Sequence, residues 1–176
     1  LVDTATRLGC PMKVYGQDFV AFEENGRMVY QDEDGLMDLT LPRLAGRHQY
    51  ANAAAAIAAV KSAGFEIGHD AADRAMGSVE WPGRMQRLPH GRLSELAPEG
   101  SEVWIDGGHN PGAGLVVAEA LTEQEERLAR PLFLIAGMIN TKDEAGYMRP
   151  LAAVAQSLTA ITIPEEPNSQ PAEVTE

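Results

Sequence analysis

A polar, glycine-rich stretch at residues 106–111, Asp-Gly-Gly-His-Asn-Pro, is the part of this sequence best suited to chemistry. It directly follows a short apolar run at 103–105, which we expect to be a strand. Polar residues between the carboxyl end of a strand and a helix lie where open α/β sheets bind ligands. Asp106 suits ribose hydroxyls or a metal-bound water, and His109 suits a carboxylate. The alternative is a glycine-rich turn in which Asn110 caps a helix.

Two basic side chains stand where a phosphate could be bound. Arg84 follows a Trp-Pro-Gly turn at 81–83, and arginine suits two-point hydrogen bonding to phosphate. Lys142 lies in the stretch 137–143, directly after an apolar run at 132–136. The alternatives are a domain hinge with a solvated arginine, and a lysine that forms a salt bridge within its loop or stabilises a domain interface.

Two amide side chains lie at the start of an alanine-rich stretch. Gln49 and Asn52 are three residues apart, so both fall on one face of a helix. Their amide groups could read the edge of an adenine. The alternative is ordinary helix-start chemistry, in which Asn52 satisfies a local backbone group.

Several other chemistries do not fit the residue spacing. None of the three lysines is preceded by glycine, so the sequence has no Walker A phosphate loop. The glycines at 107, 108, 112 and 114 miss the spacing of a dinucleotide fold, and the four histidines are scattered, with no pair at metal-ligand spacing. We therefore expect no metal ligands in this chain. Cys10 is the single cysteine, which excludes an internal disulfide and favours a reducing compartment.

Composition narrows the range of partners. The net charge is −12, which argues against nucleic acid or membrane as the main partner. No apolar run is long enough for a membrane span. We expect a cytoplasmic, monomeric protein that binds small molecules. The chain starts without Met and runs out without a closing element, so we expect that it is truncated at both ends.

The first part of the chain predicts a small meander followed by helices. Short apolar runs separated by turn residues predict strands near 13–15, 19–22, 28–30 and 39–41. An alanine-rich helix at 52–63 ends at a glycine, and we expect it to be buried because alanine lets another backbone approach closely. A shorter helix is expected at 70–76. The pattern changes near 79–83, which predicts a domain boundary.

Beyond that boundary, strands alternate with helices. We expect strands at 85–88, 103–105, 132–136 and 158–163, and helices at 115–128 and 144–156. This alternation predicts an α/β domain with a mostly parallel sheet. The continuous apolar run at 132–136 is typical of a strand that is buried on both faces.

Taken together and in order, four stretches resemble the folylpolyglutamate synthase/dihydrofolate synthase branch of the Mur ligase superfamily. They lie at residues 44–53, 81–86, 106–111 and 137–143, and the resemblance extends over residues 40–165. It implies that residues 1–80 form the C-terminal portion of a central ATPase domain. Residues 81–176 would then be an incomplete, Rossmann-like C-terminal (glutamate ligase) domain with a mostly parallel sheet.

The resemblance also implies a reaction. The family uses ATP and Mg²⁺ to join L-glutamate to dihydropteroate or to a (poly)glutamyl folate through an acyl phosphate. By resemblance, Asn52 contacts adenine, Arg84 the ATP phosphates and Asp106 the nucleotide, while His109 positions the incoming glutamate. His109 and Arg84 are the expected catalytic residues. The resemblance assigns no role to Lys142 and Asp143.

The sequence departs from the family in its missing parts. The phosphate loop, the metal ligands and the modified lysine of the family have no counterpart here, and we expect them upstream of Leu1. The isolated chain is therefore expected to be inactive. Two alternatives stay open: a peptidoglycan-type Mur ligase, and a non-catalytic module that binds a nucleotide or glutamate.

Overall fold

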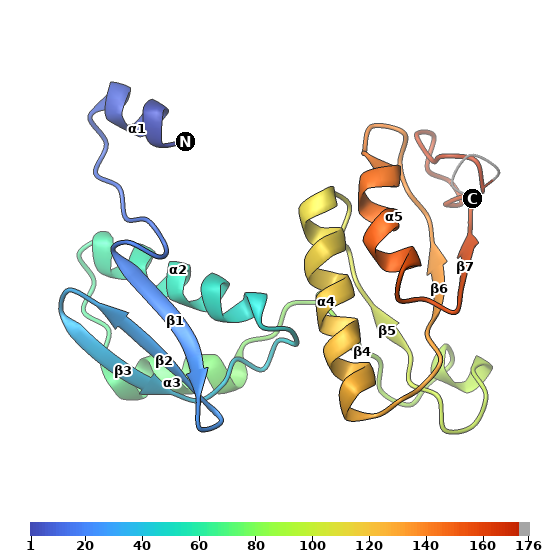
Figure 1. Ribbon diagram of the computed structural model, residues 1–176, viewed down its shortest axis with the longest axis horizontal. Helices are drawn as coiled ribbons and strands as arrows, with labels where there is room; N and C mark the ends of the chain where they lie inside the picture. The colour runs from blue at the N-terminus through green and yellow to red at the C-terminus, as the bar shows by residue number, and fades with distance from the viewer. Residues whose placement is uncertain (173–176) are drawn as a thin grey trace. The chain divides into compact units, whose positions relative to one another are not determined.

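The computed structural model describes residues 1–172 and divides into two compact units. The first unit covers Leu1–Trp81, and the second begins at Pro82 (Figure 1). Their assignment to a central ATPase domain and a glutamate ligase domain stays a prediction.

The first unit contains a three-stranded antiparallel meander. Its strands are β1 (Phe19–Glu24), β2 (Arg27–Asp32) and β3 (Gly35–Leu39), paired in that order. Asn25 and Gly26 form the first turn, with φ of 52° and 75°. Positive φ at both positions is what a tight two-residue hairpin turn requires, and Asn-Gly is the pair best suited to it. The meander expected from the sequence is present.

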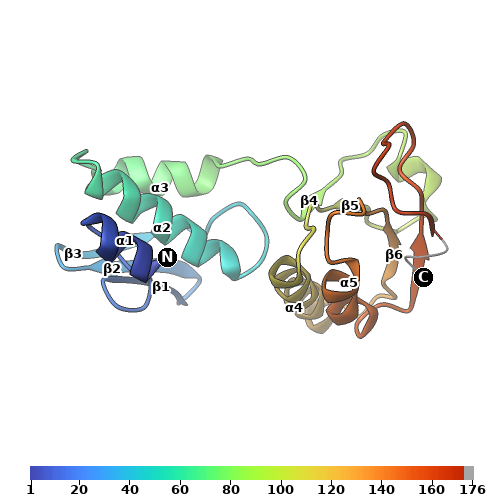
Figure 2. The ribbon, with the colours of Figure 1, turned by 90° about the horizontal axis from the view of Figure 1, so that it is seen from above.

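Two helices cover one side of this sheet (Figure 2). Helix α2 (His48–Ser62) packs against β1, and α3 (His69–Ser78) packs against β3. Residues two apart along each strand point to the same face, so alternate strand residues and the inner faces of both helices form one core. Its members are Phe19, Ala21, Met28, Tyr30, Leu39, Ala54, Ile57, Ala58, Ala72 and Met76.

The burial expected for the alanine-rich helix is only half right. Ala54, Ile57 and Ala58 are buried, but Ala55, Ala56 and Ala59 are exposed on the other side of α2. Alanine is the strongest helix former and is tolerated on a solvated face as well as in a core. The alanine run therefore predicts the helix itself, but only one side of that helix packs closely against its neighbours.

The start of the chain differs from the expected strands. Residues Val2–Leu8 form helix α1, which buries no side chain. The strand expected at 13–15 is wrong: only an isolated bridge joins Tyr15 to Phe19. The reason is a tight turn, in which Asp18 accepts a hydrogen bond of 2.7 Å from the backbone N–H of Val14. The segment folds back on β1 and does not extend the sheet.

The second unit pairs short strands with two longer helices. Strands β4 (Gln86–Arg87) and β5 (Trp104–Ile105) are antiparallel, while β6 (Phe133–Ala136) and β7 (Ser157–Ala160) are parallel. Helix α4 (Pro111–Arg127) follows β5, and α5 (Glu144–Ala152) follows β6. A short 3₁₀ helix, η1, covers Ser94–Leu96. The α/β class expected from the sequence is confirmed, with a parallel pair in this unit.

One face of β6 is open, which contradicts the expected burial on both faces. Phe133 and Ile135 are 62% and 73% exposed, whereas Leu134 and Ala136 are half-buried. Alternate residues of a strand point to opposite faces, so only the face that carries Leu134 and Ala136 is covered by residues 1–172.

Among residues 1–172, no helix is long and apolar enough to cross a membrane.

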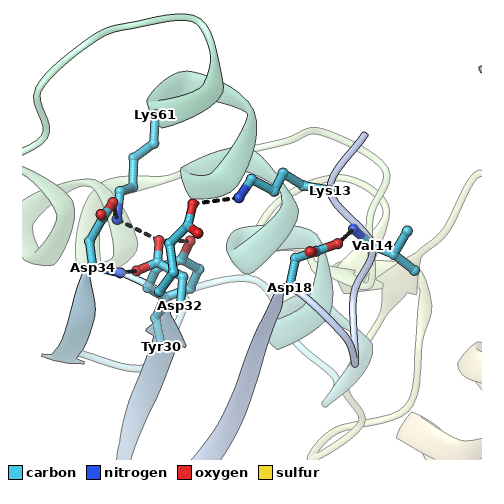
Figure 3. Close-up of polar contacts among 8 residues, drawn as sticks. Lys13, Val14, Asp18, Tyr30, Asp32, Asp34 and Lys61 are labelled. Carbon is cyan, nitrogen blue, oxygen red and sulfur yellow. Dashed lines mark hydrogen bonds and ion pairs between the residues drawn. The ribbon is translucent and has the colours of Figure 1, made fainter. Parts of the chain in front are cut away.

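A cluster of charges joins the β2–β3 turn to the end of α2 (Figure 3). Lys61 forms ion pairs with Asp32 and, at 2.8 Å, with Asp34. The Tyr30 hydroxyl donates a hydrogen bond of 2.7 Å to Asp32, whose side chain is only 12% exposed. This set of contacts fixes the helix end to the meander.

Replacing Asp32 by asparagine is expected to lower the free energy of unfolding by about 1–2 kcal/mol at neutral pH. Burial raises the pKa of Asp32, but hydrogen bonds from Lys61 and Tyr30 outweigh it and hold the pKa below its usual value. A carboxyl whose pKa is lowered by folding adds stability above its unfolded pKa, about 4, and loses that stability as the pH falls through the folded value.

Urea denaturation at several pH values checks this prediction. The difference between the Asp32→Asn variant and the parent should shrink as the pH falls below about 4. The matched control is Glu33→Gln, which removes an exposed ion pair with Lys13 in the same turn. That change is expected to cost less than about 1 kcal/mol. A difference at Asp32 that stays constant down to pH 3 contradicts the role of its charge.

Candidate active site

Strand pairing brings two of the four sequence motifs together in the second unit. In the antiparallel register Gln86 pairs with Ile105, so the residues just before Gln86 lie opposite those just after Ile105. The backbone N–H of Gly107 donates a hydrogen bond of 2.7 Å to the carbonyl oxygen of Gly83. The turn that carries Arg84 and the loop that carries His109 are therefore neighbours.

Asp106 fixes these two segments to each other with its carboxylate. Its Oδ2 accepts a hydrogen bond of 2.8 Å from the N–H of Met85, and its Oδ1 accepts one of 2.7 Å from the N–H of Gly108. Hydrogen bonds to an ionised acceptor are stronger than neutral ones. Each oxygen keeps room for a further donor. Asp106 thus links the two segments of the site by hydrogen bonds. Its expected contact with a nucleotide stays a prediction.

The turn after Pro82 is held in an unusual backbone conformation. Met85 has a φ of 39°, although it is not glycine, and it is buried. Such a conformation costs about 1–3 kcal/mol and persists only where the surroundings enforce it. Here the hydrogen bond from its N–H to Asp106 and the burial of its side chain supply that constraint. The strained residue directly follows Arg84, the residue expected to bind phosphate.

Arg84 is an exposed cation without an ion pair among residues 1–172. Lys142, the other basic residue singled out by the sequence, is half-buried and likewise unpaired within the described chain. By contrast, Arg87 lies three residues after Arg84 and pairs with Glu102 at 3.0 Å. The site therefore has a positive charge that a bound anion can use.

Two helices begin side by side next to these loops (Figure 1). Asn110 caps α4 by accepting a hydrogen bond of 3.0 Å from Ala113, and Asp143 caps α5 by accepting one of 2.8 Å from Gly146. A Cβ atom added to Gly146 would lie 2.7 Å from Cγ of Pro111, the first residue of α4. The helix starts thus pack closely, and their free N–H groups favour negative charge nearby.

His109 is exposed and oriented by its own loop. Its Nδ1 lies 2.9 Å from the carbonyl oxygen of Gly107. A carbonyl oxygen only accepts, so Nδ1 must carry the proton. In the neutral ring this leaves Nε2 as an acceptor, and in the charged ring Nε2 is a donor that suits a carboxylate.

Nitrogen NMR of the histidine rings is expected to show His109 as the Nδ1–H tautomer at a pH where the ring is neutral. The reason is the hydrogen bond to Gly107, since free imidazole in water favours no such fixed arrangement. His90, which is exposed and forms no hydrogen bond to a backbone carbonyl within residues 1–172, is the internal comparison. An Nε2–H signal for His109 contradicts the orientation described here.

Asn52 lies in the first unit, in the first turns of α2. Its amide donates a hydrogen bond of 3.0 Å to Oε1 of Gln49, and Gln49, which is buried, contacts His48 through its own amide. Gln49 is thus used within the helix start, while Asn52 stays exposed and bonds to a side chain rather than to the backbone group of the alternative. Of the four expected site residues, the structure brings together Arg84, Asp106 and His109.

Tyr147 is a residue of this site that sequence reasoning missed. Its ring is buried against Gly108, and burial followed by the nearby charge of Asp106 raises the pKa of its hydroxyl to about 12. The sequence gives only a weak signal for it, namely its position one helical turn after Asp143. Nothing local links it to a loop nearly forty residues earlier.

Comparison with known proteins points to one family. No protein-family model matches the chain. The folylpolyglutamate synthase of Lacticaseibacillus casei is 26% identical over 150 residues, which are 82% of this chain and 32% of that protein. The dihydrofolate synthase/folylpolyglutamate synthase of Haemophilus influenzae is 25% identical over 170 residues, 93% of this chain and 38% of that protein. The chain thus spans about a third of the length of these relatives.

Solved structures agree with these relatives. E. coli FolC in complex with DHPP and ADP superimposes with a TM-score of 0.76 at 28% identity, over 99% of this chain and 38% of FolC. The folylpolyglutamate synthase of Mycobacterium tuberculosis complexed with ADP gives a TM-score of 0.78 at 26% identity, over 99% and 38%. The match covers both units and all four motifs. Over both units, the chain is therefore similar in sequence and in fold to folylpolyglutamate synthases and dihydrofolate synthases.

Proposed function

We propose that this chain supplies part of the active site of an ATP-dependent ligase, which joins L-glutamate to dihydropteroate or to a (poly)glutamyl folate. The carboxylate of the acid is phosphorylated by ATP, and the amine of glutamate then displaces the phosphate to form an amide. The family supports the reaction type, and the relatives that bind ADP support the nucleotide.

The observation that carries this proposal is the joining of the Arg84 turn to the Asp106–His109 segment. Two hydrogen bonds join them, from Gly107 to Gly83 and from Met85 to Asp106, and a third, from Gly108 to Asp106, fixes the second segment internally. Phosphoryl and acyl transfer depend mainly on positioning and on stabilising developing charge. A cation on a fixed turn, on a segment that neighbours an oriented imidazole and two helix starts, suits both tasks.

Each expected site residue then has a role. Arg84 neutralises charge on the phosphoryl group, and His109 holds a carboxylate of the incoming glutamate. Asp106 keeps the two segments in register and has lone pairs left for nucleotide hydroxyls. Asn52 contributes adenine contact from the first unit.

Mg²⁺ is the metal that the family uses, and the residues described here do not fit it. Residues 1–172 contain no group of three His, Cys, Asp or Glu side chains that could hold a metal ion. Magnesium needs several oxygen ligands at once. We therefore assign no step of the reaction to a metal held by this chain.

We further propose that the isolated chain does not turn over, since its sequence has no Walker A loop to hold the ATP phosphates. The test measures phosphate release with ATP, glutamate and dihydropteroate, omitting one substrate at a time. No release that depends on both glutamate and dihydropteroate is expected from this chain alone. Dependent release by the purified chain overturns this part of the proposal.

A non-catalytic binding module is the second candidate, favoured by the same missing loop. It predicts that ATP or glutamate binds this chain alone with a micromolar Kd in calorimetry. The ligase proposal predicts no such tight binding, because the chain carries only part of each site. A substrate panel on a protein with the complete active site separates the folate acids from peptidoglycan precursors.

We also propose a monomer in a reducing, cytoplasmic setting. The free, exposed thiol of Cys10 is compatible with such a compartment. Gel filtration of the reduced protein tests the monomer.

A further inference from the structure

The aromatic ring of Tyr147 lies directly on the backbone of Gly108. A Cβ atom added at Gly108 would be 2.8 Å from Cε2 of Tyr147 and 3.0 Å from its hydroxyl oxygen, and 2.8 Å from Oδ1 of Asp106. Real Cβ atoms essentially never approach another atom so closely, so only glycine fits while the ring is in place. The ring and this glycine are therefore complementary in shape.

Tyr147 is itself held firmly. It is 7% exposed, and its N–H donates a hydrogen bond of 3.1 Å to the carbonyl oxygen of Asp143 in the first turn of α5. On its other side its backbone packs against Gly114 of α4. The ring thus projects from the packed helix pair and can act as a fixed support.

Gly108 connects the ring of Tyr147 to the side chains of Asp106 and His109. Its N–H is bound to Asp106, and the preceding residue, Gly107, accepts the hydrogen bond from His109. A shift of Gly108 therefore moves the partners of both Asp106 and His109. The raised pKa of Tyr147, to which Asp106 contributes, is consistent with a short distance between the phenol and this carboxylate.

We propose that the ring of Tyr147 is a positioning residue that seats Gly108 and so sets the orientation of Asp106 and His109. Its catalytic consequence rests on the proposed ligase function, whereas the positioning itself does not. We expect the ring to carry the effect, because its Cε2 would lie nearer to a Cβ atom at Gly108 than the hydroxyl oxygen would.

The experiment measures amide hydrogen exchange and histidine ring NMR on this chain without any substrate. Tyr147→Ala is expected to accelerate exchange at Gly108 by at least about tenfold relative to amides of β6, and to shift the His109 ring signals. Tyr147→Phe is expected to keep both at the level of the parent. The matched control is Leu151→Ala, which removes a buried side chain of the same helix one turn later.

A paired substitution makes the test independent of overall stability. Gly108→Ala alone is expected to loosen the loop because its methyl group meets the ring. In a Tyr147→Ala background the same change is expected to have a smaller effect, since only the contact with Oδ1 of Asp106 then remains. Equal effects of Gly108→Ala in both backgrounds, or equal effects of Tyr147→Ala and Leu151→Ala at Gly108, overturn the proposal.

The measurements distinguish failure of the proposed ligase function from failure of the positioning role. If the exchange and ring signals follow the expected pattern but no ligase activity is found in the complete protein, the positioning role stands and the function falls. If ligase activity is found and Gly108 is insensitive to the ring, only the positioning role is lost.

Discussion

Under the proposed ligase function, replacing Arg84 by alanine in a protein with the complete active site is expected to lower kcat/KM by about 100- to 1,000-fold, or about 3–4 kcal/mol of transition-state stabilisation. The guanidinium has no ion pair within residues 1–172, and it follows a turn whose backbone is fixed by Asp106. Because the backbone beside Arg84 is fixed in advance, only the side chain itself has to be ordered when charge develops. Most of the loss should appear in kcat, because the developing phosphoryl charge exists only in the transition state.

The matched control for Arg84 is Arg87. It removes the same charge three residues away, but its guanidinium is exposed and paired with Glu102. Arg87→Ala is expected to change kcat/KM by less than about threefold, since an exposed ion pair contributes little. Arg84→Lys should restore part of the activity, because lysine keeps the charge but loses two-point hydrogen bonding. Similar losses at Arg84 and Arg87 would mean that only general surface charge is at work.

Local signals made much of the site predictable. The apolar run before Asp106 and the Asn110-Pro111 pair predicted a strand, a loop and a helix, and all three are present. Asn110 caps α4 because its short side chain reaches a free N–H, and Pro111 needs no partner in the first turn. In the first unit, Asn25 and Gly26 are among the turn residues between the strands expected near 19–22 and 28–30, and they form the hairpin for the same kind of local reason.

Features that depend on distant pairing were not predictable. The bond from Met85 to Asp106 exists only because β4 and β5 pair in one register, which no short stretch encodes. The contact of Tyr147 with Gly108 depends in the same way on how α5 lies beside the loop. Burial of the run at 132–136 was overestimated, because a continuous apolar pattern does not say whether both faces of a strand are covered.

Close packing of α4 on α5 also depends on a single residue, Gly114. It is buried, and a Cβ atom added there would overlap the backbone carbonyl group of Tyr147. A backbone group cannot rotate away as a side chain can, so the two helices would have to separate. Overpacking of this kind costs about 1–3 kcal/mol or more, which exceeds the gain of about 1 kcal/mol in helix propensity from glycine to alanine.

Gly114→Ala is therefore expected to destabilise the second unit by about 1–2 kcal/mol net, and the larger Gly114→Val to leave that unit largely unfolded. The control is Gly112→Ala in the same helix, where the added methyl group meets only Asn110 at 3.4 Å. That change should stabilise by up to about 1 kcal/mol, because alanine favours the helix. Urea denaturation followed through Trp104, in a Trp81→Phe background, measures both. The two alanine substitutions should have opposite signs, and a stabilising Gly114→Ala would mean that α4 and α5 do not meet at this glycine.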